Sequence, residues 1–104
     1  MKRVKRRYLA LQLEMDGVPS EKELLDVFWG SVVRFYGEVG ASLTSMALIS
    51  FDVSCKIVVV RVSLEALDSF RSSLACITNV AGKSASVHVL AVSGTIKALF
   101  AKLS

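Results

Sequence analysis

The sequence predicts a single α/β sandwich in which one sheet is covered by helices. Strand-like and helix-like segments follow one another in the order β-α-β-β-α-β-α. A length of 104 residues suits one domain, which we place over residues 1–104. Residues 57–60 are all β-branched, which is typical of a strand that is covered on both faces.

The first strand and the first helix carry clear local signals. Apolar and polar residues alternate over residues 8–15, which predicts a strand. Residues 16–19 form a turn, and Ser20 and Glu23 then have the spacing of a capping box, in which each side chain accepts a hydrogen bond from the other's backbone N–H. We therefore predict a long helix that runs through about residue 38.

The apolar residues of this helix cover a wider arc than an amphipathic surface helix needs. Its centre is marked by Leu25, Phe28, Val32 and Val39, and one flank by Trp29, Val33 and Tyr36. Two interpretations follow: the helix is deeply buried in its own domain, or one flank faces a second chain.

The rest of the chain predicts three more strands and two more helices. Strands are expected at residues 46–51, 56–62 and 85–92. Ser63 can cap the helix between the last two, and Gly82 lies beyond the end of that helix. A short helix is expected over residues 95–104.

This order gives two split β-α-β units, which build a ferredoxin-like α/β (α+β) sandwich with a four-stranded antiparallel sheet. The additional short C-terminal helix is expected near the second face of the sheet or on its rim.

Positive charge is concentrated at the start of the chain. Lys and Arg outnumber Asp and Glu by 13 to 9, and the first acidic residue is Glu14. We define residues 1–7 as a basic N-terminal arm, which carries Lys2, Arg3, Lys5, Arg6 and Arg7. Such a density of cations favours an anionic partner, nucleic acid first and a membrane surface second.

The apolar segments and the first residues of the chain indicate where in the cell the protein is found. No segment reaches the ~20 apolar residues that a membrane span needs. Polar and acidic residues soon follow the basic start, which makes it a poor signal peptide. We expect a cytoplasmic protein without membrane contact, whose high apolar content is partly covered by a partner.

Residues that could carry chemistry are few. His88 is the single histidine and is expected within a strand in a structural role, and Cys55 and Cys76 are expected to be reduced and buried. We identify no catalytic residues, no metal site and no bound cofactor. The strand at 56–62 also lacks the aromatic residues with which an RNA recognition motif stacks bases.

Two segments remain as candidate RNA contacts. The basic arm could contact phosphates, with Tyr8 at its junction with the first strand. The second is the turn Ser93-Gly94-Thr95, in which Gly94 would allow an unusual backbone turn and Thr95 or Ser93 would cap the last helix. Lys97 adds a charge beside this turn.

Four segments together resemble archaeal ribonuclease P protein component 2. They are Lys5-Arg6-Arg7-Tyr8-Leu9, residues 33–41 with Tyr36-Gly37-Glu38, residues 70–77, and Val92-Ser93-Gly94-Thr95-Ile96-Lys97. The resemblance implies a ferredoxin-like subunit that assists a catalytic RNA, which uses Mg²⁺ to cleave precursor tRNA at its mature 5′ end. It also implies a TIM-barrel-like partner (protein component 3), other ribonuclease P proteins, and a homodimer or heterotetramer.

By position, the resemblance assigns Arg6, Arg7, Tyr8, Gly94, Thr95 and Lys97 to RNA contact. We place the protein-partner surface around Trp29, Val33 and Tyr36, or on the last helix around Leu99 and Phe100. Two alternatives stay open: a ferredoxin-like domain that binds a small ligand or another protein, and a hydrolase that uses His88.

Overall fold

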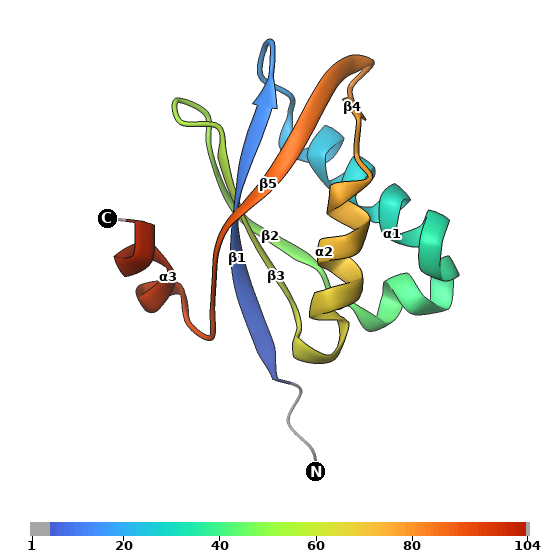
Figure 1. Ribbon diagram of the computed structural model, residues 1–104, viewed down its shortest axis with the longest axis vertical. Helices are drawn as coiled ribbons and strands as arrows, with labels where there is room; N and C mark the ends of the chain where they lie inside the picture. The colour runs from blue at the N-terminus through green and yellow to red at the C-terminus, as the bar shows by residue number, and fades with distance from the viewer. Residues whose placement is uncertain (1–4, 104) are drawn as a thin grey trace.

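A computed structural model describes residues 5–103, apart from the side chains of residues 41–43. An antiparallel sheet has two helices on one face and a third helix on the other (Figure 1). The elements in chain order are β1 (Arg6–Met15), α1 (Glu21–Leu43), β2 (Ala47–Asp52), β3 (Ile57–Ser63), the short 3₁₀ turn η1 (Leu64–Ala66), α2 (Leu67–Ala75), β4 (Asn79–Val80), β5 (Lys83–Ser93) and α3 (Ile96–Leu103).

The order of the strands confirms the predicted pair of split β-α-β units. The sheet runs β2-β3-β1-β5-β4, so that β3 lies between β1 and β2, and β1 lies between β3 and β5. The predicted number of four strands is wrong, because β4 adds a fifth. Ala81 and Gly82 both have positive φ, as in a two-residue hairpin loop, and this tight turn pairs β4 with β5.

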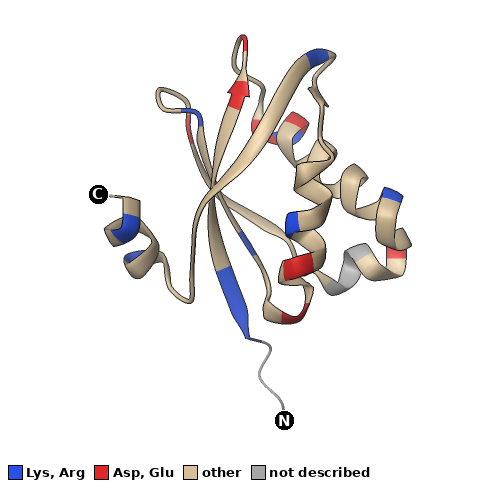
Figure 2. Cartoon of the chain, in the orientation of Figure 1, with Lys and Arg blue, Asp and Glu red and all other residues tan. Residues whose placement is uncertain are grey.

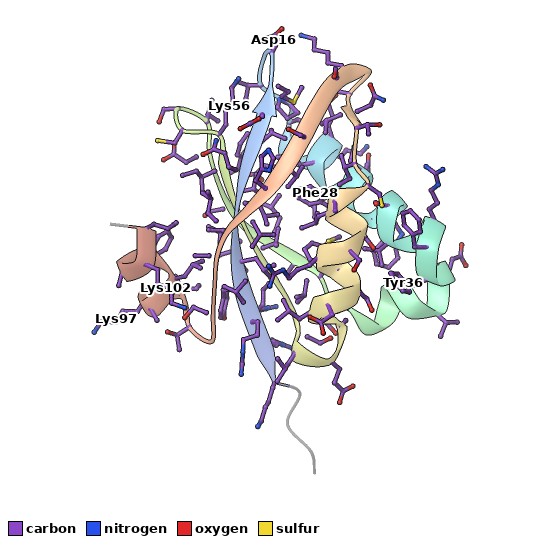
Figure 3. All side chains as sticks on the ribbon, in the orientation of Figure 1. Asp16, Phe28, Tyr36, Lys56, Lys97 and Lys102 are labelled. Carbon is purple, nitrogen blue, oxygen red and sulfur yellow. The ribbon has the colours of Figure 1, made fainter. Side chains whose placement is uncertain are left out.

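The main core lies between the sheet and helices α1 and α2. Leu24, Phe28 and Val32 recur every four residues along α1 and are fully or almost fully buried. Phe28, which is labelled in Figure 3, meets Phe70 of α2 edge to face, with ring centroids 6.4 Å apart. The hydroxyl of Ser31 also donates a hydrogen bond of 2.7 Å to the Ser73 carbonyl, which links the two helices.

Helix α1 begins as predicted, bends at Gly37 and continues to Leu43, beyond the predicted end at about residue 38. Ser20 N–H donates to Glu23 Oε1 at 2.9 Å and Glu23 N–H donates to Ser20 Oγ at 3.1 Å, which confirms the capping box. Gly37 interrupts the helix with φ 73° and ψ 175°. The periodicity therefore changes phase there, and Val39, predicted at the centre of the buried arc, is 77% exposed.

Helix α3 covers part of the second face of the sheet, as the sequence predicted. Leu99 packs on Ala10 and Val59, and all three are at most 1% exposed. Val58 and Val60, on either side of Val59, pack into the main core on the α1–α2 side. Alternate residues of β3 therefore belong to two different cores. The double cover explains the β-branched run of β3. We call the α3 side of the sheet its outer face.

Three smaller predictions need correction. Ser63 precedes η1 but its side chain makes no capping hydrogen bond. Cys55 and Cys76 are free, as expected, but both are exposed. Cys55 lies in the β2–β3 turn and Cys76 directly after α2, so both occupy surface connections where no second layer covers them.

Within residues 5–103, no helix combines the length and apolar character of a membrane span.

Candidate nucleic-acid interface

The basic start of the chain and the turn before α3 lie at the same end of the sheet (Figure 1). β1 pairs with β5 so that Tyr8 lies opposite Ser93, which brings Arg7 beside Gly94. A Cβ placed on Gly94 would lie 3.6 Å from Arg7 Nη1 and 3.9 Å from Arg7 Cζ. The two candidate RNA-contact segments of the sequence therefore form one surface, which we call the basic end.

The strand holds the described part of the arm in place. β1 begins at Arg6, so the predicted arm of residues 1–7 overlaps the strand. Arg6 and Arg7 pair with Ser63 and Val62 of β3, and the Lys5 carbonyl accepts a hydrogen bond of 2.8 Å from Leu64 N–H. Lys2 and Arg3 lie outside the described residues.

The basic end has positive charge without matching acid. Figure 2 shows Lys and Arg at the start of β1, on β3 and on α3. Among residues 5–103 no lysine or arginine forms an ion pair with an acidic side chain, and Glu14 lies beside His88. Glu65 of η1, directly after β3, lines a cavity on the α1–α2 side and forms no ion pair with a lysine or arginine of the described residues. Anionic ligands are therefore favoured here.

Arg61 is a member of the basic end that the sequence interpretation missed. It lies on β3 directly opposite Tyr8, and the alternation of the strand turns it to the outer face. Its Nε atom is buried and has no hydrogen-bond partner. The available signal was the position of Arg61 as the one charged residue within the apolar run of β3.

The residues around the turn have defined structural roles. Thr95 Oγ1 accepts a hydrogen bond of 3.2 Å from Ala98 N–H, which confirms it as the cap of α3. Gly94 does not have positive φ, so the predicted unusual backbone turn is wrong. Lys97 is exposed and projects away from the sheet, whereas Lys102 Nζ donates to the Val92 carbonyl at 2.7 Å (Figure 3).

Tyr8 is partly buried in the small core beneath α3, where it packs with Ala10, Val59 and Leu99. Part of the ring is thus used to support α3. The outer-face residues of β3 are Ile57, Val59, Arg61 and Ser63, so this strand offers no row of aromatic rings for stacking bases. Contact with phosphates is the chemistry that this surface supports.

Comparison with known proteins identifies the family. Residues 7–104 match the model of the Rpp14/Pop5 family. The chain belongs to the Rpp14/Pop5 family. This confirms the resemblance drawn from the four sequence segments.

Curated relatives carry the name "Ribonuclease P protein component 2". The relative from Pyrococcus horikoshii is 34% identical over 97 residues, which cover 93% of this chain and 81% of the relative. The relative from Methanobrevibacter smithii is 33% identical over 99 residues, which cover 88% of this chain and 82% of the relative.

A solved structure supports the fold of this Rpp14/Pop5 member. A chain in the cryo-EM structure of yeast ribonuclease MRP superposes with a TM-score of 0.73 at 16% identity. The superposition covers 91% of this chain and 78% of that chain. At this low identity, the similarity shows the shared fold alone.

The residues predicted to contact a protein partner differ in exposure in this Rpp14/Pop5 chain: four are exposed or half-buried, and one is fully buried. Trp29 and Tyr36 are 41% and 44% exposed on α1, Phe100 is exposed on α3, and Val33 is half-buried against the core. Leu99 is fully buried within the chain, so the prediction that it faces a partner is wrong. It packs on Ala10 and Val59 because the outer face of the sheet needs an apolar cover.

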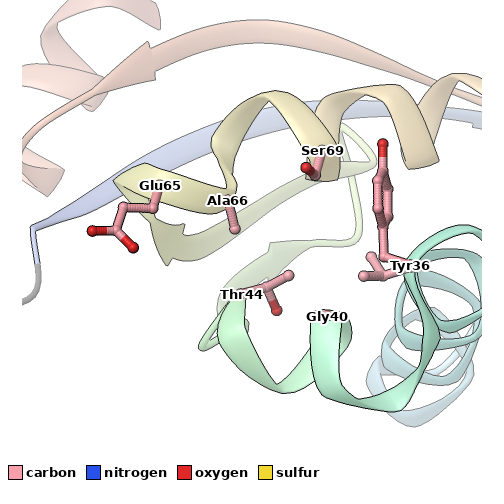
Figure 4. A pocket seen from close by; sticks show the side chains of 7 residues that line it. Tyr36, Gly40, Thr44, Glu65, Ala66 and Ser69 are labelled. Atoms are coloured by element: carbon pink, nitrogen blue, oxygen red, sulfur yellow. The ribbon is translucent and has the colours of Figure 1, made fainter.

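A cavity between α1 and α2 bears on the small-ligand alternative (Figure 4). Its volume is about 250 Å³, and Gly40 and Thr44 line it opposite Ala66 and Ser69, with Tyr36 at one end. Drug-sized ligands occupy pockets of about 300–1,000 Å³ that enclose most of their surface. This cavity lies below that range, so it gives the small-ligand alternative little support.

The hydrolase alternative fails on geometry. His88 lies on the part of the outer face that α3 does not cover, with its side chain 57% exposed. Its Nε2 atom lies 3.4 Å from Glu14 Oε2 and 3.3 Å from Ser86 Oγ. A catalytic triad needs the acid and the nucleophile on different ring nitrogens. Here both contact the same nitrogen, so the histidine cannot relay a proton between them.

Proposed function

We propose that this chain is a non-catalytic protein subunit of ribonuclease P, which supports a catalytic RNA in cleaving precursor tRNA to form the mature 5′ end. The basic end carries this proposal, because its cations converge at one edge of the fold without acidic partners among the described residues. Membership of the Rpp14/Pop5 family and relatives named as ribonuclease P subunits support it.

The proposed role follows from how the cations are held. Arg6 and Arg7 belong to a strand that is paired on β3, so their spacing relative to the turn at Gly94 is fixed. Fixed cations orient an RNA backbone more effectively than a free tail, since less side-chain and main-chain freedom is lost on binding. Phosphate contacts of this kind set register and orientation, and they leave sequence reading to the RNA itself.

Catalysis in the complex would come from the RNA and its Mg²⁺ ions. Among the residues that the structure describes, no three His, Cys, Asp or Glu side chains gather as a metal site. We propose that the chain acts by positioning RNA through the basic end, and we expect no cofactor bound to it.

Protein partners would use a different surface. Trp29 and Tyr36 expose large apolar areas on α1, on the helix side of the sheet, whereas Arg61 of the basic end faces the outer side. We propose this α1 surface for ribonuclease P protein component 3 or for a second copy of the chain. Separate surfaces would allow RNA and protein to bind at the same time in a cytoplasmic ribonucleoprotein.

Reconstitution tests the proposed function. The chain is added to its cognate ribonuclease P RNA, with and without protein component 3, and 5′ processing of precursor tRNA is measured at limiting Mg²⁺. We expect cleavage that depends on both proteins. Absence of any effect with folded protein and folded RNA would reject the subunit assignment and favour an interaction domain that works outside ribonuclease P.

A further inference from the structure

Arg61 occupies an unusual position for a cation. It lies on the interior strand β3, half-buried on the outer face, and its neighbours along that face of β3 are Val59 and Ser63. Its cross-strand partners are Tyr8 of β1 and Ala47 of β2. The arginine is therefore flanked by a small side chain on one neighbouring strand and by an aromatic ring on the other.

The guanidinium has no acceptor within the described part of the protein. Arg61 makes no hydrogen bond or ion pair with residues 5–103, and its Nε is shielded from water. A buried donor without an acceptor destabilises the folded protein, because its hydrogen bond to water is lost and not replaced. Because a protein rarely keeps such a group without a use, an external acceptor is the physical explanation that the position favours.

The acidic residues of the same sheet are too far away to serve. Asp52 pairs with Ile57, four residues along β3 from Arg61, which corresponds to about 13 Å. Glu14 lies six residues along β1 from Tyr8, or about 20 Å. Both lie toward the opposite end of the strands from the basic end.

Cations, in contrast, lie close by. Arg6 is two residues from Tyr8 on the same face of β1. Tyr8 lies between its two cross-strand partners, which are Arg61 on β3 and Ser93 on β5. Arg61, Tyr8 and Ser93 thus form a row of one guanidinium and two hydroxyl groups, with Arg6 one step nearer the end of the sheet. Hydroxyl and guanidinium donors in one row suit an oxyanion.

We infer that Arg61 binds an RNA phosphodiester on the outer face of the sheet and thereby extends the basic end inward from the start of β1. This inference rests on the proposed function and assigns it a specific contact. A phosphate backbone is favoured over a single protein carboxylate because Lys5, Arg6 and Arg7 flank the same end without acidic partners, which suits a chain of negative charges. The planar guanidinium also matches two phosphate oxygens at once.

The test uses Arg61→Met and Arg61→Gln in the full chain, with cognate ribonuclease P RNA as the probe. Affinity is measured by fluorescence anisotropy over a series of salt concentrations. Loss of one phosphate contact should lower the slope of log K against log salt by about 0.7–0.9. The melting temperature of free Arg61→Met should be equal to or above that of the wild type, because the unsatisfied donor is removed.

Arg71→Met is the matched control, because Arg71 is an exposed arginine of α2 on the opposite side of the sheet. It removes the same charge and should leave the slope unchanged. Equal slope losses in the Arg61 and Arg71 variants would show a general charge effect and reject the specific contact.

Other outcomes separate the possible errors. Wild-type protein that fails to bind the RNA would overturn the proposed function and this inference together. Wild-type binding with an unchanged slope in Arg61→Met would overturn the inference alone. A large loss of melting temperature would show that Arg61 is structural. Lost association with protein component 3 at an unchanged RNA slope would assign Arg61 to a partner's carboxylate.

Discussion

Arg7 lies against Gly94, with its guanidinium Nη1 3.6 Å from the position that a Cβ on that glycine would occupy. The two residues are 87 positions apart in the sequence, and the pairing of β1 with β5 brings them together. Arg7 Nη1 also donates to the Arg6 carbonyl at 2.9 Å, which holds the side chain across the turn. The contact makes Gly94 a position from which the charge of Arg7 can be altered without mutating the arginine.

Gly94→Glu should place a carboxylate beside Arg7 and neutralise it. The added Cβ fits, since 3.6 Å is an ordinary van der Waals distance and Gly94 lacks positive φ. We expect the log–log salt slope of RNA binding to fall by about 0.7–0.9, as for the loss of one phosphate contact. Gly94→Gln is the control of equal shape and should keep the wild-type slope. A similar loss in both variants would show that bulk at the turn, and not charge, blocks RNA.

Combined removal of the basic start should have the largest effect on RNA binding. The variant Lys5→Gln/Arg6→Gln/Arg7→Gln should lower the salt slope by about 2–3, because three phosphate contacts are lost. Side-chain substitution is preferred to deletion, since Arg6 and Arg7 pair with β3 and the Lys5 carbonyl accepts from Leu64 N–H. The melting temperature should change little.

The control triple removes the same charge elsewhere on the surface. It combines Lys22→Gln, Arg71→Gln and Lys83→Gln, all at exposed positions. A slope equal to that of the wild type is expected. If both triples weaken binding equally, net charge would account for the effect and the basic end would lose its special role.

The order of elements was predictable because it depends on local patterns. The alternation in β1, the capping box at Ser20 and Glu23, and the β-branched run of β3 each need only a few neighbouring residues. β4 was missed because it has two residues, too few for a period, and because Ala81 is an unusual choice for a hairpin position with positive φ.

The site was predictable only in part because its residues meet through the tertiary fold. The segments around Arg7 and Gly94 stood out by composition, but their contact depends on the register of β1 and β5. Arg61 is visible in the sequence as the one charged residue of an apolar strand, but its missing acceptor is a property of the packed sheet and could not be predicted. Leu99 was assigned to a partner because its burial depends on which face α3 covers.

The docking of α3 can be tested by comparing two adjacent residues. Leu99 is fully buried on Ala10 and Val59, whereas Phe100 is 48% exposed. Leu99→Ala should lower the free energy of unfolding by about 2–5 kcal/mol, unless α3 detaches at a smaller cost. Phe100→Ala should cost about 1 kcal/mol or less.

Urea denaturation gives the free energies for both variants, and amide hydrogen exchange over α3 reports detachment. Detachment would appear in Leu99→Ala as rapid exchange in residues 96–103 while the β1 amides stay protected. Equal effects of the two substitutions on stability and exchange would contradict the packing of Leu99 on the outer face.

The bend of α1 depends on Gly37, and a second glycine of the same helix provides the control. Gly37 has φ 73° and ψ 175°, a combination that is essentially restricted to glycine. Because nothing lies within 4 Å of an added Cβ, the cost of Gly37→Ala would be conformational, about 1–3 kcal/mol of unfolding free energy.

Gly30 lies inside the helix, also with nothing within 4 Å of an added Cβ. Gly30→Ala should therefore stabilise the protein by about 0.5–1 kcal/mol. Thermal denaturation of both variants measures the opposite signs, and stabilisation by Gly37→Ala would show that α1 continues straight through residue 37 in solution.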